Sequence, residues 1–119
     1  MPINETKRAA NARRRILRNP SSVSFVKPAV VTATTSTPET TLDPQTVRIS
    51  PDSRASMTES VTGMAARRRV VVFGWRNHAT LADTDMAEGY RFSYDGENYR
   101  INDILRPPGE IQGLSEAIA

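Results

Sequence analysis

Residues 90–101 read YRFSYDGENYRI, two alternating apolar and polar runs on either side of Asp95-Gly96. Both turn residues tolerate positive φ, so this dipeptide predicts a tight β-hairpin. Because side chains alternate across a strand, the apolar residues share one face whether the loop has two residues or four. The opposite face carries Arg91, Ser93, Asn98 and Arg100, so the hairpin has a single core-forming face, made of Tyr90, Phe92, Tyr94, Tyr99 and Ile101.

More strands are predicted before the hairpin. The continuous apolar run 70–73, Val-Val-Val-Phe, is typical of a strand buried on both faces. We expect a strand over 67–75 in which Arg67-Arg68-Arg69 is a charged lead-in and Gly74 marks a bulge. Residues 78–81 fit a short second strand, followed by a turn at 82–85.

After the hairpin, the chain should continue as a strand to Leu105. The sequence Arg106-Pro107-Pro108-Gly109 then predicts a turn, because proline and glycine favour turn conformations. Residues 110–119 are compatible with either a strand or a short helix, and Gly113 weakens both.

The first 18 residues predict a basic helix. Asn4 can cap a helix over residues 5–18, and Asn19-Pro20 ends it because the residue before a proline is pushed out of the helical region. Residues 1–18 have a net charge of +5, whereas residues 70–119 have a net charge of −4. This asymmetry indicates that the segment contacts nucleic acid or an acidic partner protein. The residues expected to make that contact are Arg8, Arg13, Arg14, Arg15 and Arg18.

Residues 19–66 are rich in Ser, Thr and Pro, and TATTSTPETT at 32–41 is the extreme case. Short β-prone pieces at 23–26, 30–31 and 47–49 are able to add to a partner's sheet but not to form a core. Two interpretations stay open, a disordered linker and an arm threaded along other subunits. The predicted fold is mainly β: a basic, Ser/Thr/Pro-rich extended N-terminal arm over 1–66, starting with the short helix, and a small antiparallel barrel or sandwich over 67–119.

The small size of the core-forming segment indicates that the chain depends on neighbours. About 50 residues are near the lower limit for independent folding. The chain has no cysteine, which excludes disulfides and thiolate metal sites. No apolar run is long enough for a membrane span, so we expect no membrane partner. The start lacks the apolar region of a secretory signal, although a mitochondrial presequence is an alternative for this Arg-rich segment.

Little in the sequence points to catalysis. His78 is the only histidine, and the chain has neither a nucleophile-elbow pattern nor a glycine-rich phosphate loop. We therefore expect no enzyme activity and no cofactor. Asp83 and Asp85 could bind a divalent cation, but this spacing is common in turns, and metal binding stays open. The hairpin aromatics could stack nucleic-acid bases, although their face is also the only one able to form the core.

The stretch GYRFSYDGENYRINDIL at 89–105, followed by PPGEI at 107–111, resembles the head-completion or stopper proteins of tailed bacteriophages. The family pattern is x-Gly-Asp and a strand, then Asp-Gly-x-x-Tyr-x-Ile/Val, then x-x-Ile/Val. It is matched here by Tyr90 to Tyr94, residues 95–101 and Ile104. The first 66 residues depart from the family, whose members are usually shorter and less Ser/Thr-rich there.

The resemblance implies a small β-barrel that forms a ring in the phage neck, joins head to tail and helps to retain packaged DNA. The implied partners are further copies of this chain, a portal or adaptor protein, a tail or tail-terminator protein, and the packaged DNA. The implied location is the head–tail junction of the virion, after assembly in the host cytoplasm. A candidate ring-interface loop contains Asp83, Asp85 and Glu88.

Two alternatives stay open. The first is an RNA-binding structural subunit of a ribosome-like particle, which the net charge of −4 in residues 70–119 counts against. The second is a minor capsid or decoration protein, which differs from the neck protein only in its location.

Overall fold

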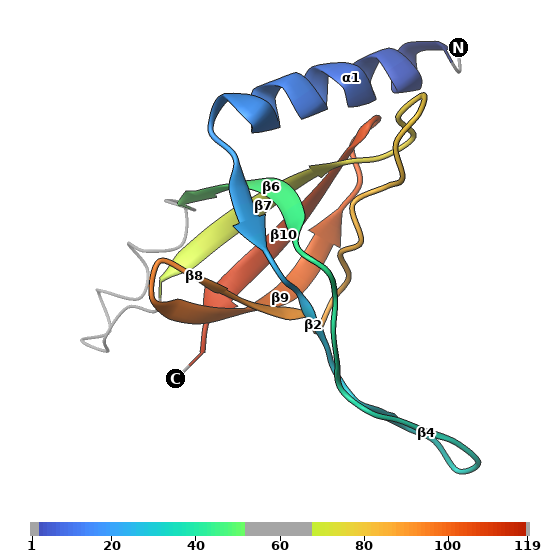
Figure 1. The fold of residues 1–119 in the computed structure, drawn as a ribbon, viewed down its shortest axis with the longest axis vertical. Coiled ribbons are helices and arrows are strands. Elements are labelled where there is room, and N and C mark those ends of the chain that lie inside the picture. Colours follow the sequence, from blue (N-terminus) through green and yellow to red (C-terminus); the bar gives the residue numbers. More distant parts are fainter. Residues whose placement is uncertain (1–2, 52–67, 119) are drawn as a thin grey trace.

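The computed structural model describes residues 3–51 and 68–118. Predictions that fall on residues 52–67 lie outside the described part. The described chain is mainly β, as predicted, and carries an N-terminal helix (Figure 1). Its elements are α1 (Ile3–Arg18), β1 (Ser21–Val23), β2 (Val26–Lys27), β3 (Val30–Val31), β4 (Ser36–Thr37), β5 (Thr40–Thr41), β6 (Gln45–Pro51), β7 (Arg69–Trp75), β8 (Arg91–Tyr94), β9 (Glu97–Leu105) and β10 (Glu110–Ala117).

Eight of the described strands form one antiparallel sheet in the order β1-β6-β7-β10-β9-β8-β2-β5. Strands β1 and β2 lie near opposite ends of this order, yet only Ser24 and Phe25 separate them in the chain. The sheet therefore curls into a half-barrel whose two ends are joined by the segment 21–27 (Figure 1).

The predicted hairpin is confirmed with its two-residue turn. Tyr94 pairs with Glu97 and Phe92 pairs with Tyr99. Asp95 has a φ of 50° and Gly96 a φ of 79°, the left-handed pair that matches the twist of the flanking strands. Phe92 and Tyr99 stack with ring centroids 5.4 Å apart and are buried, so these two rings form core and are not a base-stacking platform.

The strand over 69–75 is confirmed, but the bulge expected at Gly74 is wrong. Gly74 pairs in regular register with Ile111, and the register shift of this sheet falls instead between β9 and β10, at Leu114/Ser115. Glycine is required at position 74 because a Cβ there would lie 2.6 Å from the Thr84 Cβ. Residues 110–117 form a strand, which decides between the two predicted alternatives.

The short strand expected at 78–81 is also wrong, because these residues form bends. Asn77 has a φ of 59°, so the chain leaves the extended conformation directly after β7. The Asp83 Oδ1 accepts a hydrogen bond from the Asn77 N–H at 2.8 Å, which folds residues 77–83 back as a loop.

The division of the chain into an arm over 1–66 and a core-forming domain over 67–119 does not describe the core. Phe25 and Val47 have no exposed surface, and both lie in the same cluster as Phe92 and Tyr99. Phe25 meets the Phe92 ring edge-on with centroids 5.6 Å apart. Among the strands before residue 52, β1 buries one side chain and β6 buries two, and the others bury none, which leaves too few repeats for a sequence pattern to reveal.

Helix α1 is confirmed and lies across one side of the sheet (Figure 1). It begins at Ile3, so Asn4 lies in the first turn and not at the N-cap position. Ala9, Ala12 and Ile16 are buried on its inner face. These positions follow at three- and four-residue spacing, which is how one face of a helix covers a sheet. The helix contacts β6, β7 and β10.

Candidate functional site

The candidate site consists of two exposed surfaces, the outer side of α1 and a ribbon of strands that leaves the barrel. Both depend on how the barrel fixes the chain at their base.

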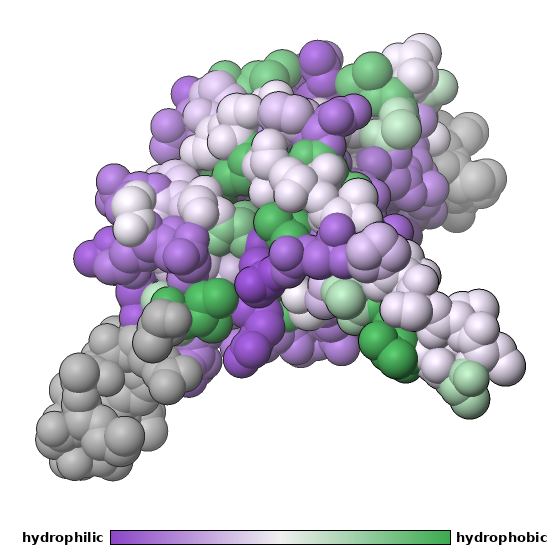
Figure 2. All heavy atoms as spheres, turned by 60° about the horizontal axis from the view of Figure 1, so that its bottom comes forward, coloured by the Kyte–Doolittle hydropathy of each residue, from purple (hydrophilic) through white to green (hydrophobic). Residues whose placement is uncertain are grey.

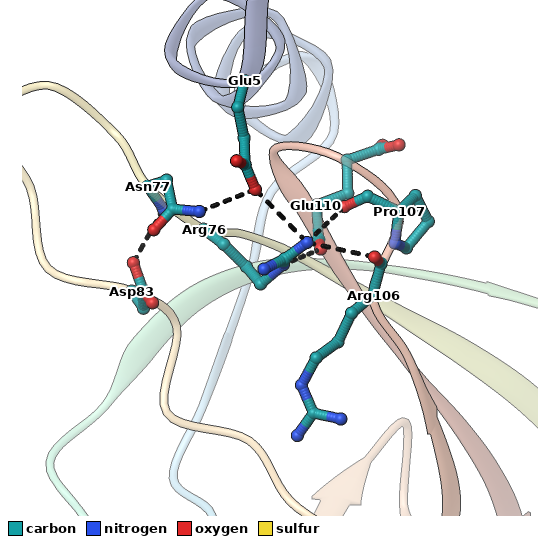
Figure 3. A network of polar contacts seen from close by, with 7 residues as sticks. All are labelled: Glu5, Arg76, Asn77, Asp83, Arg106, Pro107 and Glu110. Atoms are coloured by element: carbon teal, nitrogen blue, oxygen red, sulfur yellow. Dashed lines mark hydrogen bonds and ion pairs between the residues drawn. The ribbon is translucent and has the colours of Figure 1, made fainter. Parts of the chain in front are cut away.

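Arg76 fixes the first turns of α1 to the barrel. Its guanidinium donates hydrogen bonds to the carbonyl oxygens of Glu110 at 2.8 Å and of Arg106 and Pro107 at 3.0 Å each. Glu5 points from the helix toward this group, with 3.4 Å between its Oε1 and Arg76 Nη2 (Figure 3). A planar guanidinium suits this task because its several N–H donors can reach acceptors on different elements.

The neighbouring side chain Asn77 adds a second link to the helix. Its Nδ2 donates to Glu5 Oε1 at 2.7 Å, while its backbone N–H donates to Asp83 (Figure 3). Glu5, Asn77 and Asp83 thus join the helix, the end of β7 and the following loop in one polar network.

The turn between β9 and β10 supports the middle of the helix. Gly109 has a φ of 75°, and a Cβ at this position would lie 2.5 Å from the backbone nitrogen of Ala9. Only glycine allows the turn to approach the helix backbone this closely.

Two of the five arginines predicted to contact a partner are used inside the chain. Arg13 is half-buried and lies over the Trp75 ring, with its guanidinium carbon 5.9 Å from the ring centroid. Arg15 pairs with Glu110, with 2.6 Å between Nη2 and Oε1. Both side chains help to hold α1 on the sheet.

The other three predicted contact arginines face away from the barrel. Arg8, Arg14 and Arg18 are exposed, as is Lys7, which the sequence analysis did not select. Within residues 3–51 and 68–118, none of these four side chains forms an ion pair. Their charges are therefore available to a partner.

The second arginine cluster belongs to the barrel. Arg68 pairs with Glu97 at 3.6 Å and Arg69 pairs with Glu116 at 3.5 Å. A hydrogen bond with Tyr99 and the charge of Glu97 raise the pKa of Arg68. These contacts agree with the prediction of a charged strand lead-in, and Arg67 lies outside the described residues.

The predicted ring-interface loop is held by internal contacts. Asp83 accepts from Asn77, and Asp85 Oδ1 accepts from the Tyr90 hydroxyl at 3.1 Å. Burial raises the pKa of Tyr90, and the negative charge of Asp85 raises it further. The Gln45 side chain also bonds the backbone N–H and carbonyl of Asp85, at 2.8 and 3.1 Å. Asp83, Asp85 and Glu88 are all exposed, and these contacts involve the two aspartates.

The two loop aspartates do not converge on one point. They bond different partners, and in the described ranges no three side chains of His, Cys, Asp or Glu gather in a way that could hold a metal ion. The structure thus gives no support to a cation site at 83–85.

The second surface is a two-stranded ribbon over residues 26–41, named here the β-ribbon. Strand β2 pairs with β5, and β3 pairs with β4 in the same register, so the ribbon is one hairpin interrupted near Pro28 and Pro38. At the tip, the Thr32 N–H donates to the Thr35 carbonyl at 2.8 Å, and the two hydroxyls lie 2.6 Å apart.

The β-ribbon is bonded to the barrel where it begins and is exposed to solvent along the rest of its length. At the base, the Leu42 N–H donates to the Phe25 carbonyl at 2.8 Å, and Arg91 forms an ion pair with Glu39. Every residue from 27 to 41 is exposed, and Val31 keeps 77% of its surface in solvent. In the space-filling view the ribbon stands out from the body as a pale projection of near-neutral hydropathy with apolar atoms along it (Figure 2).

Sequence reasoning missed the residues that position these surfaces. The sequence predicts only a strand end at Trp75 and a turn at Gly109, and it assigns no role to Arg76. The contacts of these residues with the helix and with the turn at 106–110 span 30 to 101 positions in the chain, so no local pattern marks them. The β-ribbon carried a usable signal, because the Thr-rich residues 32–41 directly follow the β-prone pair at 30–31, but the low complexity of this stretch concealed it.

Comparisons with known proteins add no relative. No protein-family model matches the chain, and no curated protein matches it either. The resemblance of residues 89–111 to head-completion proteins therefore stays a prediction. In the described part of the chain, no helix has the length and apolar character needed to cross a membrane.

Proposed function

We propose that the protein is a structural subunit of a larger assembly, of the head-completion type found in the neck of tailed phages. In this proposal it binds further copies of itself in a ring and contacts a portal or adaptor protein on one side and a tail protein on the other. Its role is to join head to tail and to help retain the packaged DNA.

The observation that carries this proposal is the β-ribbon. A two-stranded hairpin without a covering layer is only marginally stable in water. This one leaves the barrel with all residues from 27 to 41 exposed, including Val30 at 52% and Val31 at 77%. Its open edges offer unpaired backbone groups, and extended segments use such groups to bind another chain.

The barrel supports the proposal in a second way. The two ends of the sheet are joined through the buried Phe25 and through Val26, where the ribbon begins. A force on the ribbon is therefore transmitted to the core. A projecting element on a rigid base suits a subunit that must lock onto neighbours.

The burial of the hairpin aromatics removes one argument for the RNA-binding alternative. The aromatic residues of the hairpin that could stack bases are the buried Phe92 and Tyr99 and the partly buried Tyr94, which packs against the core. A sheet that binds single-stranded RNA presents such rings to solvent. What still favours that alternative is the basic side of α1.

The test is a tagged pull-down from the native source, with and without nuclease, followed by mass spectrometry. Portal and tail proteins that survive nuclease are the expected result. Recovery of ribosomal RNA and ribosomal proteins, lost after nuclease, would instead establish the alternative. Recovery of capsid protein without portal or tail proteins would point to a decoration protein.

A ribbon-less variant sharpens this test. Replacing residues 28–39 by Asn-Gly joins Lys27 to its partner Thr40 through a two-residue turn and leaves the barrel intact. We expect this variant to stay folded and to lose its partner proteins. The matched control is Leu105→Ser, which removes an exposed apolar side chain, 41% accessible, from the body. If the ribbon-less variant recovers the same partners as the control, the ribbon is not the binding element.

A further inference from the structure

We propose that the outer face of α1 binds the phosphate backbone of duplex DNA without regard to base sequence. The outer face is the exposed side of the helix, opposite Ala9, Ala12 and Ile16. It consists of Lys7, Arg8, Asn11, Arg14, Arg15 and Arg18.

The charges of this face are aligned. Lys7, Arg14 and Arg18 follow at intervals of seven and four residues, which places them along one line of a helix. Arg8 lies beside that line. From Lys7 to Arg18 the face is about 16 Å long, enough to reach several phosphates of a duplex.

No carboxylate of the helix weakens this face. Glu5 is the only acidic residue of α1, and it is turned toward Arg76 and Asn77 on the barrel (Figure 3). Arg15 is neutralised by Glu110, which leaves four cations, Lys7, Arg8, Arg14 and Arg18, without an ion pair among the described residues.

The composition of the face favours a duplex over other polyanionic partners. Stable protein interfaces have an apolar or aromatic centre. Among residues 5–18, the exposed side of α1 carries one large apolar side chain, Leu17, which is 44% exposed and lies beside the cations near the end of the helix. Binding of single-stranded nucleic acid relies on exposed aromatic rings, which the face lacks. Cations aligned on one side of a fixed helix suit contacts to the phosphates of a regular duplex.

The helix presents these cations on a rigid support. Arg76, Asn77, Gly109 and Trp75 hold its inner side against the barrel. Little conformational freedom of the helix backbone is therefore lost when it binds.

The outer face of α1 is separate from the ribbon. Binding of DNA by this face rests on the proposed function, in which the subunit helps to retain packaged DNA. The two can fail separately, because DNA binding is measured with the purified chain alone. The ribbon-less variant should bind duplex DNA as the full chain does.

The test is fluorescence anisotropy of a labelled random-sequence duplex, titrated with the full chain at several salt concentrations. Four neutralised phosphates give a slope of log affinity against log salt of about −3.6. In the variant Arg14→Gln/Arg18→Gln, we expect affinity to fall about tenfold at low salt and the slope to become shallower by about 2.

The matched control is Lys27→Gln/Arg100→Gln, which removes two exposed positive charges from strands elsewhere and changes the net charge equally. We expect its affinity to stay within about twofold of the unchanged chain. A second variant, Lys7→Gln/Arg8→Gln, removes the other end of the face and should repeat the loss if the first variant is poorly folded.

Three results would overturn the inference. Equal losses in the helix variants and the control would mean that net charge, not this face, attracts DNA. Binding of polyglutamate as tight as that of the duplex would assign the face to an acidic protein. Tighter binding of a single strand of the same sequence would assign binding to another surface.

Discussion

The barrel and the β-ribbon are built from similar residues, but the barrel strands bury side chains in the core and the ribbon leaves its side chains exposed to solvent. Val47 on β6 has no exposed surface, whereas Val31 on β3 is 77% exposed. Both lie in antiparallel strand pairs opposite a serine: Val47 pairs with Ser21, and Val31 pairs with Ser36. The difference is what lies on the faces of each pair, since β6 has the hairpin aromatics over it and the ribbon has only solvent.

This contrast shows that β-propensity sets the conformation of a segment but not its role. A run of Val and Thr becomes core when the topology covers it and becomes a projecting arm when it does not. The boundary lies within the segment that sequence analysis treated as one arm: Phe25 is fully buried and Lys27 is exposed.

The strongest test of this boundary is Phe25→Ala. We expect it to lower the free energy of unfolding by about 3–5 kcal/mol, because it empties a site against Tyr90 and Phe92. Val31→Ala in the ribbon should cost less than about 0.5 kcal/mol. Urea denaturation followed by circular dichroism measures both. If the two variants have equal stability, Phe25 does not belong to the core and the arm does begin before it.

The attachment of the helix is tested by two glycines with the same kind of backbone. Gly109 has a φ of 75° and Gly96 a φ of 79°, but a Cβ at Gly96 meets nothing within 4 Å. Gly96→Ala should therefore cost only the conformational strain, about 1 kcal/mol. Gly109→Ala should cost about 1–3 kcal/mol more, because the helix backbone must move.

The emission of Trp75 distinguishes movement of the helix from general loss of stability. Arg13 on the helix covers this ring, and Trp75 is the only tryptophan of the chain. A red shift in folded Gly109→Ala that is absent in Gly96→Ala is the expected result. Identical spectra would show that the helix does not depend on the turn.

The smallest expected effect is the pH dependence of stability that the tyrosines cause. All three tyrosines lie in the barrel and none lies in the ribbon. Burial raises the pKa of folded Tyr90 and Tyr99 above the ordinary value of 10.0. The unfolded chain therefore loses these protons first, so their contribution to stability is complete below about pH 10 and declines as the pH rises through the raised values.

Tyr90→Phe removes the hydrogen bond to Asp85 and should cost about 1 kcal/mol at neutral pH. Its stability should then decline less between pH 9 and 11, by roughly the share of one phenol. Unfolding midpoints in urea across this range measure the difference. If the stability of this variant declines as much as that of the unchanged chain, the pKa of Tyr90 is the same in the folded and unfolded states.

Much of the candidate site followed from local sequence. The basic helix, predicted over residues 5–18 and found over 3–18, was predictable because its charge pattern and the stop at Pro20 act within a few residues, whereas the cap expected at Asn4 was wrong. Which of its cations have partners inside the chain was not predictable, because Arg13 lies over Trp75 and Arg15 pairs with Glu110, 62 and 95 positions further along the chain. Asp83 and Asp85 lie in an irregular segment after β7 and bond Asn77 and Tyr90, and their contact with a ring neighbour stays a prediction.

The sequence by itself determined the hairpin at residues 90–101, the strand at 69–75 and the basic helix. Each rests on interactions between near neighbours: a two-residue turn, an apolar run, a charged segment ended by Pro20. Only the tertiary structure decided that Phe25, Val47 and Ile49 complete the barrel and that residues 27–41 leave it. Closure joins strands that are distant in the chain, and burial depends on what those strands bring over each side chain, which no local pattern encodes.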